Sequence, residues 1–195
     1  MSNRSFVVVL LALGAIALLG FGLIAKNERK LEIGAGLVGP PYSDAGGLID
    51  RPYESLGDPG EGDGKRQIAD YRGKYVLINL WASWCTTCGK ESAALQSYYE
   101  RHRDEGFVIL GINTEDQEGE ALDFIDEYNL TYPMSRDSER HARTDYGSRG
   151  FPESFLVDPR GRLVLISRAP VERNYLEKAV TPIIRGKLDP LEDVG

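Results

Sequence analysis

The chain has 195 residues and a formal net charge of −7, with 42% hydrophobic and 27% charged residues. This acidic balance, with no polybasic patch in the body of the chain, argues against nucleic acid as a partner. Without its apolar N-terminus the chain is long enough for one domain with a sizeable core and too short for two ordinary domains.

The N-terminus carries an apolar segment. Residues Phe6 to Ala25 contain no charge and no strongly polar group, and twenty such residues at about 1.5 Å per residue are enough to cross a bilayer. We predict an uncleaved transmembrane anchor over residues 1–25. A cleaved secretory signal is the alternative, although the segment exceeds a usual signal core and Leu23-Ile24-Ala25 is a poor cleavage site.

The orientation of this anchor depends on the long domain C-terminal to it. Lys26, Arg29 and Lys30 come directly after the segment, and the positive-inside rule alone places that side in the cytoplasm. Long domains translocate largely regardless of charge, so we expect the rest of the chain on the extracytoplasmic face. A Gly- and Pro-rich tether is predicted over 26–50, followed by one domain over 51–190.

Apolar runs and helical patterns alternate along that domain. Strands are predicted for Tyr75–Trp81 and Phe107–Asn113, each followed by a helix, around Glu91–Tyr99 and over Glu118–Tyr128. A polar helix around Glu139–Tyr146 precedes a hairpin of Ser154–Asp158 and Leu163–Ser167, and a last helix covers about Glu172–Arg185. The order β-α-β-α-β-β-α predicts an α/β fold with a mixed sheet and helices on both faces.

The only two cysteines lie in one short motif, Trp84-Cys85-Thr86-Thr87-Cys88, between the first strand and the first helix. Cysteines three apart on the first helical turn share one face, so they can close a small disulfide ring. If the helix begins near Cys85, its free N–H groups and dipole stabilise the Cys85 thiolate. Cys85 is then the nucleophile and Cys88 the resolving thiol of a redox disulfide.

Two other uses of this motif are weaker. A zinc site needs two further ligands, and His102 and His141 lack the spacing of a zinc pair. A purely structural disulfide of this spacing closes too short a loop to constrain the unfolded chain much. A Cys-x-x-Cys in a βαβ pattern therefore favours redox chemistry.

Three segments together resemble one known family. They are Arg72 to Cys88, the strand Val108 to Asn113, and Tyr146 to Asp158 with its Gly-x-Pro-Glu-Ser-Phe-Leu-Val-Asp sequence. Over about residues 38–186 the chain resembles the thioredoxin fold, and within it the membrane-anchored thiol-disulfide oxidoreductases of the TlpA/ResA/CcmG (DsbE) type. The resemblance implies a thioredoxin fold whose central mixed sheet is flanked by helices.

The resemblance also implies site residues. Pro152 matches the family's cis-proline, which faces the two sulfurs, and the backbone of Phe151 before it can pair with an extended substrate segment. Trp84 is expected to shield the motif and to form part of the docking surface. The family uses an acidic residue after the second strand to tune the buried thiol, and here Glu115 and Asp116 both qualify, with Glu115 slightly favoured.

We therefore expect an extracytoplasmic protein-disulfide reductase. The resemblance implies a membrane thiol donor of the CcdA/DsbD type and apocytochrome c as the client, whose haem-attachment thiols must be reduced. No metal, flavin or nucleotide cofactor is expected, and no dinucleotide fingerprint is present. One alternative is a disulfide oxidase or isomerase that uses the same cysteines, and another is a non-catalytic tethered binding or assembly module. A peroxidase is a weaker alternative, because the Thr-x-x-Cys sequence expected around a peroxide-reducing cysteine is replaced by Trp-Cys-x-x-Cys.

Overall fold

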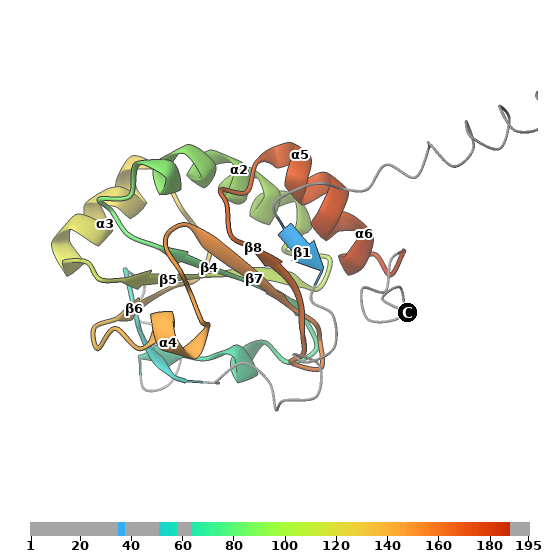
Figure 1. The fold of residues 1–195 in the computed structure, drawn as a ribbon, viewed down its shortest axis with the longest axis horizontal. Helices are drawn as coiled ribbons and strands as arrows, with labels where there is room; N and C mark the ends of the chain where they lie inside the picture. Colours follow the sequence, from blue (N-terminus) through green and yellow to red (C-terminus); the bar gives the residue numbers. More distant parts are fainter. Residues whose placement is uncertain (1–34, 38–50, 58–63, 188–195) are drawn as a thin grey trace, which may run out of the picture. The chain divides into compact units, whose positions relative to one another are not determined.

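The computed structural model describes residues 35–37, 51–57 and 64–187, whose strands form one eight-stranded sheet (Figure 1). In chain order the strands are β1 (Ala35–Leu37), β2 (Tyr53–Ser55), β3 (Lys65–Arg66), β4 (Tyr75–Trp81), β5 (Phe107–Thr114), β6 (Met134–Asp137), β7 (Glu153–Val157) and β8 (Leu163–Ser167). They lie in the order β1-β8-β7-β4-β5-β6-β2-β3. The β4/β5 and β5/β6 pairs are parallel and the others antiparallel, so the sheet is mixed, as predicted.

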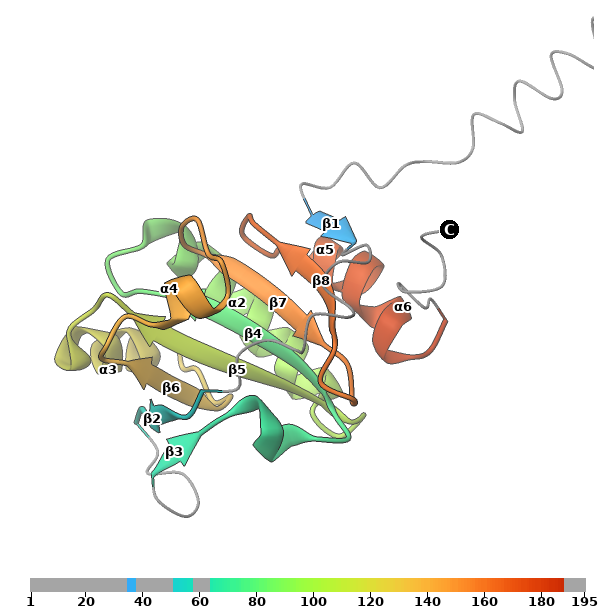
Figure 2. The ribbon, with the colours of Figure 1, turned by 60° about the horizontal axis from the view of Figure 1, so that its bottom comes forward.

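Helices cover both faces of the sheet (Figures 1 and 2). One face carries α2 (Thr86–His102), α3 (Glu118–Glu127) and a helical segment made of α5 (Arg173–Tyr175), a π-helical stretch (Leu176–Val180) and α6 (Thr181–Ile184). The opposite face carries the short α4 (Ala142–Asp145) and a 3₁₀ turn (Ile68–Tyr71). Right-handed crossovers explain the first arrangement, because β4-α2-β5 and β5-α3-β6 advance in the same direction along the sheet.

The central strand β4 is buried on both faces. Val76, Ile78 and Leu80 belong to the core cluster on the α4 side. Trp81 points to the other side, where its ring stacks on Phe124 of α3 with 4.7 Å between centroids. A strand covered on both faces shows a continuous apolar run in sequence, which is why β4 and β5 are predicted correctly.

Two elements between β5 and β7 differ from the prediction. Met134–Asp137 forms β6, parallel to β5, where the sequence analysis expects no strand. The polar helix expected around Glu139–Tyr146 covers only Ala142–Asp145. Four-residue elements contain too few positions to show a period, and β6 becomes a strand because β5 and β2 lie on either side of it.

Three short strands near the N-terminal end of the described chain, β1, β2 and β3, extend the sheet on its two sides, and β1 and β3 are its edges. β1 pairs with β8 although its residues fall inside the range predicted as a tether. β2 pairs with both β3 and β6. Short edge strands of this kind limit the unpaired backbone that a sheet presents to other chains.

The apolar segment Phe6–Ala25 lies outside the described residues. Among the residues that the structure does describe, no helix has both the length and the apolar character needed to span a bilayer.

Candidate functional site

The two cysteines lie where β4 ends and α2 begins. Cys85 is the N-cap of α2 and is joined to Cys88 by a disulfide. The backbone N–H of Cys88 donates to the Cys85 Sγ at 3.2 Å. The helix thus begins where the sequence predicts, and one of its first-turn N–H donors points at the Cys85 sulfur. Such donors stabilise a thiolate at this position once the disulfide is reduced.

An aromatic pair borders the disulfide. Trp84 is the exposed large hydrophobic residue of the described chain, with 60% of its surface accessible. Its ring meets Phe151 edge to face with 5.8 Å between centroids, and its Nε1 donates to the Glu115 carbonyl oxygen at 3.0 Å. The Phe151–Pro152 peptide bond is cis. Residues far apart in sequence therefore meet at Trp84, the neighbour of Cys85 in the chain.

Arg143 of α4 contacts both Phe151 and Glu115. Its guanidinium lies over the Phe151 ring at 5.9 Å and pairs with the Glu115 carboxylate at 3.0 Å. Glu115 itself adopts a left-handed backbone conformation with φ of 57°, which turns its carbonyl toward Trp84 and its side chain toward α4. Its carboxylate is thus engaged by Arg143.

Asp116 holds the loop before the cysteines. Its two carboxylate oxygens accept hydrogen bonds from the Ser83 N–H at 2.6 Å and the Ser83 hydroxyl at 2.8 Å. They also accept from Asn113 Nδ2 at 2.7 Å and from the Gln117 N–H at 2.9 Å. Through these hydrogen bonds Asp116 holds Ser83, and with it the segment that carries Trp84 and Cys85, against the end of β5.

Changing Asp116 to asparagine should loosen this loop. The amide replaces one acceptor oxygen by a donor, so at least one of the four converging donors loses its partner. We expect a loss of about 2 kcal/mol in the free energy of unfolding, measured in urea. Asp123→Asn, which changes a carboxylate on α3, should unfold like the wild type. Equal stability of both variants would contradict the role of Asp116.

The carboxylate nearest in sequence to Cys88 is one that the sequence analysis misses. Glu91 lies on α2, three residues after Cys88, and only 3% of it is exposed. Its Oε1 accepts from Asn79 Nδ2 at 2.8 Å and its Oε2 from the Val171 N–H at 2.7 Å. Burial raises its pKa to about 7, and these two hydrogen bonds oppose the rise.

A signal for Glu91 is present in the sequence. Residues three apart on a helix share a face, so the face that buries Cys88 also buries Glu91. A buried carboxylate with a perturbed pKa beside a reactive group is typical of a functional site. Its partner Asn79 is a second signal, because it interrupts the apolar run of β4 with a polar side chain.

A groove of about 360 Å³ opens beside Trp84. Its walls come from the loop before Cys85, the start of the β5–α3 connection and the outer face of α3; the lining residues are Ser83, Trp84, Asp116, Gln117, Glu120, Asp123, Phe124 and Glu127. The exposed Trp84 is therefore one side of a concave surface next to the disulfide, large enough to receive a side chain of another polypeptide.

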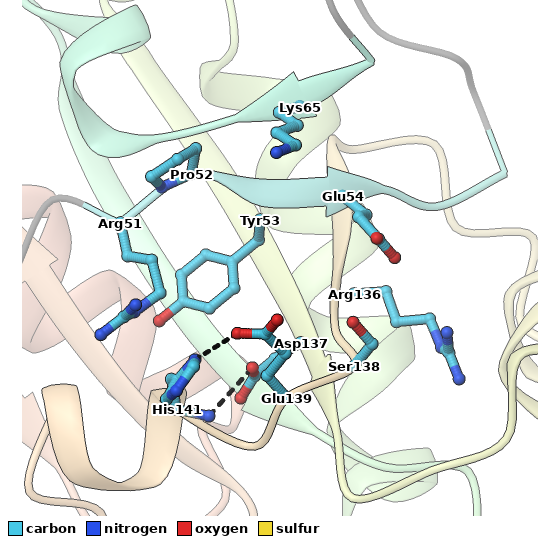
Figure 3. Close-up of a pocket in the computed structure, with 10 residues that line it drawn as sticks. All are labelled: Arg51, Pro52, Tyr53, Glu54, Lys65, Arg136, Asp137, Ser138, Glu139 and His141. Carbon is cyan, nitrogen blue, oxygen red and sulfur yellow. Dashed lines mark hydrogen bonds and ion pairs between the residues drawn. The ribbon is translucent and has the colours of Figure 1, made fainter.

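A second pocket, of about 190 Å³, lies beside the residues that precede α4 (Figure 3). The contacts around it hold α4 in place. Asp137 accepts hydrogen bonds from the His141 and Ala142 N–H groups at the start of α4. At its other end, the Asp145 carboxylate pairs with Arg51 at 2.6 Å. These contacts fix the short helix that carries Arg143.

The histidines and cysteines considered for a zinc site have other partners in the structure. His102 pairs with Glu105 and His141 with Glu139, while the two cysteines are bonded to each other. Within residues 35–37, 51–57 and 64–187, no group of three or more His, Cys, Asp or Glu side chains is placed to hold a metal ion.

Comparison with known proteins agrees with this geometry. The model of the AhpC/TSA family matches residues 53–166, which is more than half of the chain. The chain belongs to the AhpC/TSA family. Within this thioredoxin-like family, the relatives that it resembles are thiol-disulfide oxidoreductases.

Three similar proteins illustrate this placement. The thiol-disulfide oxidoreductase ResA of Bacillus anthracis is 30% identical over 125 residues, covering 62% of this chain and 72% of ResA. The thiol:disulfide interchange protein DsbE of Pseudomonas fluorescens biotype C is 34% identical over 116 residues, covering 58% and 63%. The crystal structure of the thioredoxin domain of a thiol-disulfide oxidoreductase from Bacteroides vulgatus has a TM-score of 0.62 and 25% identity, covering 71% and 96%.

The family member described here is therefore a thiol-disulfide oxidoreductase of the ResA/DsbE type with a thioredoxin-like fold, and Cys85–Cys88 is its disulfide. The predicted disulfide between Cys85 and Cys88 is present, and the roles of nucleophile and resolving thiol stay predictions. The individual roles of Trp84, Glu115, Asp116, Phe151 and Pro152 stay predictions, now with defined positions around that pair.

Proposed function

We propose that the protein is an extracytoplasmic protein-disulfide reductase, held to the membrane by Phe6–Ala25. The observation that carries the reactive step is the Cys85 sulfur at the N-terminus of α2, where it accepts the Cys88 N–H. The exposed Trp84 and the adjacent Phe151 provide a surface on which a client polypeptide can dock. Docking there brings the client disulfide to Cys85.

The reaction begins with the reduced pair. The Cys85 thiolate attacks one sulfur of the client disulfide, whose sulfur–sulfur bond breaks as a mixed disulfide forms, and the departing client sulfur takes up a proton. The Cys88 thiolate then attacks the Cys85 sulfur. The Cys85–Cys88 disulfide forms, and the second client sulfur leaves and is protonated. Two electrons and two protons have passed to the client.

Glu91 is the group that we assign to the proton of Cys88. It lies one helical turn after Cys88 and is buried, and a carboxylate with a pKa of about 7 can take up or release a proton at neutral pH. This assignment stands beside the prediction for Glu115 and Asp116, whose carboxylates face Arg143 and the Ser83 loop.

The partners are proposed from what the reaction consumes. Each turnover leaves the enzyme oxidised, so a thiol donor must return two electrons on the same side of the membrane. We propose a membrane thiol donor of the CcdA/DsbD type. Apocytochrome c is the proposed client, because the cysteines of a Cys-x-x-Cys-His haem-attachment sequence must be reduced before haem is joined to them. The likeness to ResA and DsbE supports both proposals.

A redox titration of the full chain in detergent tests the direction of the reaction. Thiol-specific mass tags report the fraction of reduced Cys85 and Cys88 across a series of thiol/disulfide buffers. We expect a midpoint at or below about −270 mV, the range of dedicated reductants. A midpoint near about −120 to −180 mV would instead indicate an oxidase or isomerase. No reversible two-electron transition would make the disulfide structural.

Alkylation of the reduced chain tests the two cysteine roles. Iodoacetamide should modify Cys85 before Cys88 in a time course followed by mass spectrometry, because the donors at the start of α2 favour the Cys85 thiolate. Equal rates at the two sulfurs would contradict the assignment of Cys85 as the nucleophile.

A further inference from the structure

A five-residue loop, Gly147–Phe151, connects α4 to Pro152 and so determines where Phe151 stands beside the disulfide. The loop begins at Gly147 in a left-handed conformation with φ of 59°. The loop is held in position by hydrogen bonds with side chains that lie outside it, those of Glu153 and Arg168.

One charge pair, between the buried Glu153 and the partly exposed Arg168, holds this loop. Glu153, the first residue of β7, is 3% exposed, and its carboxylate oxygens accept hydrogen bonds from Arg168 Nη1 at 3.1 and 3.0 Å. Glu153 Oε1 also accepts the Arg149 N–H at 3.1 Å. Arg168 Nη1 lies 3.2 Å from the Gly147 carbonyl oxygen. Both the start and the middle of the loop are thus tied to the same pair.

Arg168 comes from a distant part of the chain. It follows β8 directly, beyond the Gly-x-Pro-Glu segment, and reaches across the end of β7 to the loop. On the other side of the loop, Arg143 Nη2 contacts the Arg149 carbonyl oxygen at 3.4 Å from an exposed position. The bond to a buried carboxylate is the stronger constraint, since solvent screens exposed pairs.

We propose that Arg168 is a positioning residue for client docking. It fixes the loop that presents the backbone of Phe151 to an extended client segment, while the sulfur chemistry remains with Cys85 and Cys88. This inference rests on the proposed docking function of Phe151. It predicts that loss of Arg168 weakens recognition of peptide disulfides and leaves the exchange step itself intact.

Arg168→Gln tests this with two substrates. The first is a peptide that contains a disulfide-closed Cys-x-x-Cys-His sequence, and the second is a small aromatic disulfide without a peptide backbone. We expect KM for the peptide to rise about tenfold with kcat within about twofold of wild type, the pattern of lost binding that ground and transition states share. The rate with the small disulfide and the redox midpoint should not change.

The chain offers a matched control. Arg162 pairs with Asp158 at 2.6 Å, and the Asp158 side chain is also buried, but this pair lies beyond the other end of β7. Arg162→Gln therefore removes a similar arginine–carboxylate contact far along the strand from the loop. It should lower the melting temperature in the manner of Arg168→Gln while leaving both KM values at the wild-type level.

Three results would overturn the inference: an unchanged peptide KM in Arg168→Gln, an equal loss with both substrates, or an equal rise of KM in Arg162→Gln. If Arg168→Gln fails to fold, Arg168→Lys decides, because lysine keeps the charge but lacks the planar fork of donors. A peptide KM at the wild-type level in that variant overturns the proposal, and a raised one supports it. These results can be told apart from a failure of the proposed reductase function, because in that case the wild type itself would not reduce the peptide.

Discussion

Cys88→Ser should convert the enzyme into a trap for its client. Cys85 can still attack a client disulfide, but serine cannot displace the client from the mixed disulfide. We expect a stable adduct whose mass equals the enzyme plus the client, with turnover reduced by about a thousandfold or more. Mass spectrometry without reductant identifies the adduct, and a reducing agent should release the client from it.

Cys85→Ser is the companion variant. Cys88 is 2% exposed, so it should form little adduct with a polypeptide client, and turnover should be lost as well. The opposite pattern, with an adduct in Cys85→Ser and none in Cys88→Ser, would reverse the two roles. Full cellular function of the Cys85→Ser variant would support the alternative of a non-catalytic binding module.

Glu91→Gln should change how stability depends on pH. Burial raises the pKa of Glu91 in the folded state from 4.5 to about 7, so the folded form prefers the neutral carboxyl. The free energy of unfolding of the wild type should therefore fall as pH rises from about 4.5 to about 7, and level off above that range. At 1.36 kcal/mol per pKa unit the loss is about 3 kcal/mol.

Urea unfolding of the oxidised protein between pH 4 and pH 9 measures this dependence. Glutamine carries no charge, so Glu91→Gln should remove the fall with pH. Its amide also replaces one of the two acceptor oxygens by a donor, which lowers the free energy of unfolding by a similar amount at every pH. Glu100→Gln changes an exposed residue of the same helix and should keep the wild-type profile. If the free energy of unfolding of the wild type and of Glu91→Gln changed with pH in the same way, the pKa of Glu91 would be the same in the folded and unfolded states, and the predicted rise would be wrong.

Local patterns in the sequence predict the elements that are long or carry a distinct motif. Strands β4 and β5 are nearly continuous apolar runs. The start of α2 next to Cys85 is predicted by the Cys-x-x-Cys spacing and the helical pattern after it. Short elements escape this approach. β6 has four residues and becomes a strand through its neighbours in the sheet.

The redox pair can be identified from local sequence, because the disulfide depends on two cysteines three positions apart at a helix start. The surroundings of that pair depend instead on tertiary contacts. Glu91 has a raised pKa because the fold buries it, and the two hydrogen bonds that oppose the rise come from Asn79 and Val171, 12 and 80 positions away. Desolvation depends on everything packed around a group, and no local pattern records which distant segments will supply that packing.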